Sequence, residues 1–246
     1  MKSRLQGVHP GLHANLTAFT DEMVALYGEA LEALLLYGSG AGRNFIPGKS
    51  NINLLLVLAE LRFSDLQKYQ GRAAYWKRKG IDPPLFTTVR FLESSADIFP
   101  IEWLEIITHH VVLHGANPFR FAINHHDLRR QCEKEIREIL IRLRQAFLEV
   151  GSTPEKIEQL ALVSLNAVFP VLRSLMVLQN RNSPADREAL LAEFFKVGKI
   201  SPAPFLRIWS LKKGGTISDR DFLPWFEEYL NQLEALSRLI DDLDQN

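Results

Sequence analysis

The 246-residue chain has a single cysteine, no excess of either charge and no repeated or low-complexity segment. A lone Cys132 excludes an internal disulfide and a cysteine-based metal cluster, which indicates a reducing, cytoplasmic environment. Because Cys132 falls on the apolar stripe of an expected helix, we expect it to be buried by packing and not to act as a reactive thiol.

The absence of net charge limits the surfaces to which the protein can be drawn. The chain has 29 Lys+Arg and 29 Asp+Glu, so its formal net charge is zero. A neutral chain has no overall electrostatic attraction to nucleic acid or to an anionic membrane, which leaves a local basic patch as the route to either.

A membrane-spanning segment is also not expected. Residues 1–16 contain no apolar core of signal-peptide length. Residues 160–178 are apolar enough to be mistaken for a membrane span, but they contain Asn166, Pro170 and Arg173, which are costly in hydrocarbon. We therefore expect a buried bundle helix with a kink at Pro170.

The hydrophobic pattern divides the chain into two parts. Residues 1–117 mix helical spacing with short apolar runs, whereas residues 118–246 repeat apolar side chains every three or four positions. The predicted fold class is therefore α+β, with a small mixed sheet and flanking helices followed by an all-α helical bundle. The expected strands are residues 33–37, 52–58, 98–106 and 110–114, and the expected helices are residues 16–26, 61–79 and 128–150 and segments that begin near residues 153, 183 and 218.

One motif in the first part carries chemistry. The apolar run 34–37 leads into Gly38-Ser39-Gly40, and after a loop Asn51 and Asn53 begin the next apolar run. Glycine lets backbone N–H groups approach a phosphate closely, and a serine hydroxyl can join them. Residues at i and i+2 of a strand point to the same side, so Asn51 and Asn53 should face the same space.

This arrangement resembles the signature of the nucleotidyltransferase superfamily, as in kanamycin nucleotidyltransferase and the small bacterial nucleotidyltransferases. In that family Gly-Ser follows one strand, Asp-x-Asp begins the next, and a third acid lies on a neighbouring strand. The resemblance covers about the first 115 residues. It implies that Gly38 and Ser39 contact a nucleotide and that Glu102 stands at the third acid. Arg43 and Lys49 are basic residues of the same loop that could contact phosphates, although loop residues are usually just solvated.

The departure from the family pattern is at the acids, because Asn51 and Asn53 stand where the family has aspartates. Mg²⁺ prefers anionic oxygen ligands, and nucleotidyl transfer needs cations that clamp the attacking and leaving oxygens. At a separation of ~4 Å and an effective dielectric of ~20, each lost charge is worth roughly 4 kcal/mol per unit of metal charge. We therefore expect no metal, no cofactor and no catalysis.

Two functions follow from this resemblance. The first is an inactive nucleotidyltransferase homologue that binds a nucleotide weakly, or a protein partner, in a regulatory role. The alternative is an active enzyme that uses Mg²⁺ to transfer a nucleoside monophosphate from a nucleoside triphosphate to a hydroxyl acceptor. The alternative needs carboxylates from elsewhere in the chain to replace those missing at positions 51 and 53.

Two further clusters have simpler interpretations. Basic and aromatic residues gather in the expected helix 61–79, where they could grip nucleic acid, but solvated lysines are the commoner outcome and we do not expect nucleic-acid binding. Five of the seven histidines lie between residues 109 and 126, where a zinc site is conceivable, but no metal-ligand spacing supports it. These histidines are His109, His110, His114, His125 and His126.

Overall fold

The computed structural model describes residues 2–42, 45, 47, 50–184, 186–197, 200–218 and 221–243. They form two compact units, Met1–Ile123 and Asn124–Asn246. The hydrophobic pattern of the sequence places the division after residue 117.

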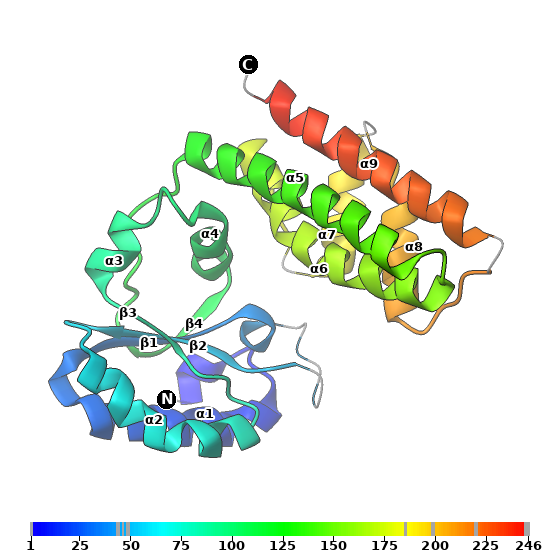
Figure 1. The fold of residues 1–246 in the computed structure, drawn as a ribbon. Helices are drawn as coiled ribbons and strands as arrows, with labels where there is room; N and C mark the ends of the chain where they lie inside the picture. Colours follow the sequence, from blue (N-terminus) through cyan, green and yellow to red (C-terminus); the bar gives the residue numbers. More distant parts are fainter. Residues whose placement is uncertain are drawn as a thin grey trace. The chain divides into compact units, whose positions relative to one another are not determined.

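The first unit is built on a four-stranded sheet in the order β3-β2-β1-β4 (Figure 1). β1 (Leu31–Tyr37) pairs antiparallel with both β2 (Asn53–Leu58) and β4 (His110–Gly115), and the short β3 (Leu85–Thr87) pairs parallel with β2. The leucine-rich centres of β1 and β2 are buried because helices cover both faces of the sheet. The predictions of strands at 33–37, 52–58 and 110–114 are confirmed.

One face of the sheet is covered by α1 (His13–Tyr27) and α2 (Phe63–Arg78) (Figure 1). Phe19 of α1 and Trp76 of α2 meet edge to face, with their ring centroids 5.0 Å apart. The Trp76 indole N–H donates to the Glu22 carboxylate at 3.0 Å, so its one polar group is satisfied at the margin of the core. This aromatic contact fixes the two helices against each other and against the sheet.

The opposite face is covered by α3 (Val89–Ser94) and α4 (Pro100–Thr108) (Figure 1). Trp103 of α4 packs in a second buried cluster with Leu35 and Leu55 of the sheet. Its indole N–H is directed to Ser95, whose carbonyl and hydroxyl oxygens lie 3.3 and 3.2 Å away. The sheet is therefore enclosed between two helical layers.

The prediction of a strand over residues 98–106 is wrong, because this segment forms α4. Pro100 occupies the first turn of the helix, where its fixed φ and missing N–H cost nothing. The run 101–106 is dense in buried apolar residues (Ile101, Trp103, Leu104 and Ile106), and periodicity alone does not separate a buried strand from a buried helix over so short a run. Glu102 consequently lies in the first turn of a helix.

The second unit is an all-helical bundle, as predicted. Its helices are α5 (His125–Val150), α6 (Pro154–Leu178), α7 (Arg187–Phe194), α8 (Ala203–Lys212) and α9 (Phe222–Asp242). α8 was not predicted. The connecting 3₁₀ turns across the chain include η1 (Lys2–Leu5), η2 (Pro10–Leu12), η3 (Gly28–Ala30), η4 (Gly38–Ala41) and η5 (Phe195–Val197).

The centre of this bundle is α6, which contacts α5, α7, α8 and α9. Among the residues that the structure describes, α6 alone is long and apolar enough to cross a membrane, but 61% of its most apolar window is buried inside the protein. Arg173 lies buried within it, and Ser164 shares a hydrogen bond of 2.9 Å with the Tyr229 hydroxyl of α9. These contacts make α6 the core helix of the bundle.

Cys132 of α5 is fully buried in this unit, which confirms the prediction of a packing role. Burial raises the pKa of its thiol to about 12, so the thiol stays protonated at neutral pH. A protonated, inaccessible thiol is a poor nucleophile and a poor metal ligand.

Candidate functional site

The Gly-Ser turn follows directly from β1. Tyr37 ends the strand and Gly38 begins η4 with φ +70°, a conformation that favours glycine. A Cβ at Gly38 would lie 3.1 Å from Asn53 Nδ2. The missing side chain at Gly38 thus lets the amide of Asn53 approach the turn, and Ser39 follows as a partly exposed residue.

The two asparagines face the space predicted for them. Asn53 is the first residue of β2 and pairs with Tyr37 of β1. Ile52 and Leu54 point into the core beneath α1 and α2, so Asn51 and Asn53 point to the other face by strand alternation. The structure therefore brings Gly38, Tyr37 and both asparagines to one end of the two central strands.

A carboxylate that the sequence analysis did not select lies beside them. Asn51 Nδ2 donates to Asp82 Oδ2 at 2.7 Å. The backbone holds this pair in place, because Ile52 forms a parallel bridge with Ile81 and the Asp82 N–H donates to the Ile52 carbonyl at 3.2 Å. Asp82 thus lies where the chain enters β3, immediately next to the start of β2.

Sequence reasoning missed Asp82 because this residue precedes two prolines, Pro83 and Pro84, and lies outside every expected strand and helix. The strand that follows is three residues long, too short to show alternation. The sequence signal for Asp82 was an acid a few residues before a short apolar run. That signal is weak unless the neighbouring strands of the sheet are known.

The Tyr37 hydroxyl belongs to the same environment. Burial, and secondly the negative charge of Asp82, raise the pKa of Tyr37 above its usual value. Tyr37 is therefore a neutral hydroxyl within electrostatic range of Asp82, where it can donate a hydrogen bond to an anion.

Of the remaining predicted site residues, Glu102 lies in a helix and not in the predicted strand. Glu102 lies on α4, whereas the strand beside β2 is β3, so the strand-based reason for choosing it as the third acid does not hold. Asp82 is the carboxylate that the structure shows next to the start of β2. Arg43 and Lys49 lie outside the residues that the structure describes.

The donors present do not fit a two-metal centre. They comprise one carboxylate and two neutral amides, and one oxygen of that carboxylate already accepts a hydrogen bond from Asn51. Two divalent cations beside a polyphosphate need several anionic oxygens. Throughout the described part of the chain, no three His, Cys, Asp or Glu side chains are grouped so that they could hold a metal ion.

Four of the basic and aromatic residues of α2 have contacts within the fold. Lys68 pairs with Asp65, and Arg72 pairs with Glu22 of α1 at 2.6 Å. Tyr69 and Trp76 are buried against the sheet and are not available to stack on bases. Among the histidines, His110 Nδ1 lies 2.8 Å from the Ile106 carbonyl, a contact that ties β4 to α4.

The fold can be compared with known proteins. No protein-family model matches the chain, and no curated protein matches it. Among solved structures, the chain is similar to spectinomycin adenyltransferase from Enterococcus faecialis, crystallised with ATP and spectinomycin, with a TM-score of 0.54 and 11% identity over 90% of this chain and 99% of that chain. At this identity the likeness shows the fold, and the predicted nucleotidyltransferase-like fold is confirmed.

Proposed function

We propose that this chain is a nucleotidyltransferase-fold protein that has lost catalysis and acts by binding, either a nucleotide with low affinity or a protein partner. The observation that carries the proposal is the hydrogen bond of 2.7 Å between Asn51 Nδ2 and Asp82 Oδ2. It engages the Asp82 carboxylate with the neutral amide of Asn51, a position where the family pattern has an aspartate.

The charge at this site argues against tight metal binding. Two aspartates and a third acid would give three negative charges, whereas Asp82 is the carboxylate that the structure shows beside Asn51. Binding a divalent cation here would require breaking the Asn51 bond and stripping water from the cation with one anionic ligand. Mg²⁺ loses its hydration shell reluctantly, so a single carboxylate is a weak anchor.

A nucleotide at this site would meet both favourable hydrogen-bond donors and an unfavourable negative charge. The turn at Gly38 and Ser39, with the Tyr37 hydroxyl nearby, offers uncharged donors to a phosphate. Without cations, however, the triphosphate would also face the negative charge of Asp82. Weak binding follows from this balance, and the ATP bound by the structurally similar adenyltransferase indicates the class of ligand to test.

The alternative of an active transferase gains Asp82, a carboxylate that the sequence analysis did not identify. One carboxylate does not provide the paired anionic ligands that clamp two cations on either side of the transferred phosphoryl group. The inactive interpretation therefore remains the stronger one.

Thermal unfolding of the wild-type protein distinguishes the inactive protein from an active transferase. We expect millimolar ATP with MgCl2 or MnCl2 to change Tm by less than about 1 °C, because stabilisation grows as RT ln(1 + L/Kd), where L is the ligand concentration, and is small while L stays below the Kd of a weak site. A rise of several degrees that disappears on addition of EDTA would show that cations are held, and the proposal would then be wrong.

A further inference from the structure

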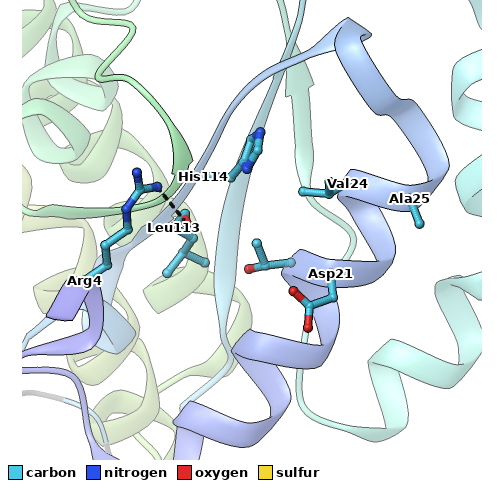
Figure 2. Close-up of a pocket in the computed structure, with 7 residues that line it drawn as sticks. Arg4, Asp21, Val24, Ala25, Leu113 and His114 are labelled. Atoms are coloured by element: carbon cyan, nitrogen blue, oxygen red, sulfur yellow. Dashed lines mark hydrogen bonds between the residues drawn. The ribbon is translucent and has the colours of Figure 1, made fainter. Parts of the chain in front are cut away.

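The first unit contains an open cavity on the side of the sheet away from the asparagines. It has a volume of about 530 Å³ and lies between α1, η1 and the edge strand β4. Its apolar wall includes Val24 and Ala25 of α1 and Leu113 of β4 (Figure 2). Cavities of this size commonly hold small molecules.

Two opposite charges line this cavity without meeting. Arg4 enters from η1 and Asp21 from α1, with Leu113 and His114 of β4 between them in the view of Figure 2. In the described structure Arg4 and Asp21 form no ion pair with each other, and the side chains of Asp21 and His114 have no hydrogen-bonding or ionic partner among the described residues. Unpaired charges held apart across one cavity are complementary to a ligand that carries both signs.

The position of Arg4 is fixed by the shape of β4. The pairing of β1 with β4 shifts register between the partners His114 and Val112, so Leu113 is an extra residue in a bulge. The Leu113 carbonyl accepts a hydrogen bond of 3.0 Å from Arg4 Nη1. A guanidinium has five N–H donors, so this bond orients Arg4 and leaves other donors for a ligand.

The α1 side of the cavity offers hydrogen-bond acceptors from Thr20 and Asp21. Asp21 follows Thr20, whose buried hydroxyl donates to the Leu16 carbonyl at 2.8 Å and retains an oxygen that can accept. The acceptors on α1 thus suit a cationic or donor group, while Arg4 suits an anionic group. The apolar wall between them suits an aliphatic spacer.

We propose that this cavity binds a zwitterionic small molecule, with its carboxylate at Arg4, its ammonium group at Asp21 and its aliphatic portion over Val24 and Leu113. The site is independent of the proposed function at Asn51 and Asp82, because it lies on the opposite face of the sheet. Neither outcome of the nucleotide experiment bears on it.

Three matched probes test this assignment. 6-Aminohexanoate carries both charges on a flexible six-carbon chain, hexanoate carries only the carboxylate, and hexylamine carries only the ammonium group. We expect isothermal titration at low ionic strength to give 6-aminohexanoate a Kd at least about tenfold lower than either single-charge probe, since each charge-assisted hydrogen bond adds affinity. Equal affinities for the three probes, or no saturable binding of 6-aminohexanoate, would overturn the assignment.

Two variants test which residue binds each charged end of 6-aminohexanoate. Asp21→Asn should remove the preference for 6-aminohexanoate over hexanoate, and Arg4→Gln should remove its preference over hexylamine. Asp97→Asn and Arg90→Gln, which change exposed charges of the same unit outside the cavity, should leave both preferences unchanged. Because the Asp21 side chain makes no hydrogen bond or ion pair with the described residues, its variant should unfold at the wild-type temperature. A loss of preference shared with the Asp97 control would contradict the proposal.

Discussion

Aspartates introduced together at positions 51 and 53 are expected to create a divalent-cation site that the wild-type protein lacks. The carboxylate of Asn51→Asp would stand where the amide now lies 2.7 Å from Asp82 Oδ2, so two anions would repel unless a cation separated them. At a cation concentration of about 100 times Kd, binding would stabilise the fold by ~2.7 kcal/mol. For a chain of this length that is a rise in Tm of roughly 5–10 °C.

The measurement is thermal unfolding of the Asn51→Asp, Asn53→Asp variant at neutral pH with and without MnCl2 or MgCl2. Without cations we expect the variant to unfold below the wild type, because repulsion replaces a hydrogen bond. Adding Asp82→Asn should relieve this loss and abolish most of the cation effect. A double variant that ignores divalent cations would show that Asp82 and the two positions do not share a site.

Release of pyrophosphate from ATP by the same double variant would extend the result to chemistry. It would mean that the loss of two charges alone accounts for inactivity. If cations bind but no pyrophosphate is released, residues other than those at positions 51 and 53 have also lost their catalytic function. That result would favour a binding role.

Replacing Gly115 by alanine is expected to have the largest effect on stability. Gly115 ends β4 with φ +72°, and a Cβ there would lie 1.9 Å from the Glu32 carbonyl oxygen and 3.1 Å from Ala33 Cα. Both contacts are with the backbone of β1, which cannot move without disrupting the central strand pairing. We expect a loss of more than about 3 kcal/mol in the free energy of unfolding.

Urea unfolding of Gly115→Ala can be compared with Gly71→Ala as a matched control. Gly71 lies within α2, has open space where its Cβ would be, and should become more stable by roughly 0.5–1 kcal/mol because alanine favours a helix. A Gly115→Ala protein as stable as the wild type would mean that β4 does not pair with β1 as described.

The sequence was informative where a pattern is long or chemically distinctive. Composition and periodicity predict the leucine runs of β1 and β2, the Gly38-Ser39 turn and the long amphipathic helices. The paired asparagines were found because the family spacing pointed to their positions, and the structure places Asn53 against Gly38 as that spacing suggests.

The failures have a common physical origin in tertiary context. α4 was assigned as a strand because a run of nine residues dense in buried apolar side chains fits either element. Asp82 was overlooked because its importance comes from a parallel neighbour, β3, which no local periodicity reveals. Choosing the third acid required knowing which strand lies beside β2, and that is a property of the sheet order.

The two margins of the sheet determine how this protein can meet another chain. β3 offers three residues preceded by Pro83 and Pro84, which have no N–H to donate, and on β4 the Leu113 carbonyl is already taken by Arg4. Both borders are thus poor templates for an incoming strand. Recognition of a macromolecule is therefore expected to rely on side-chain surfaces and not on extension of the sheet.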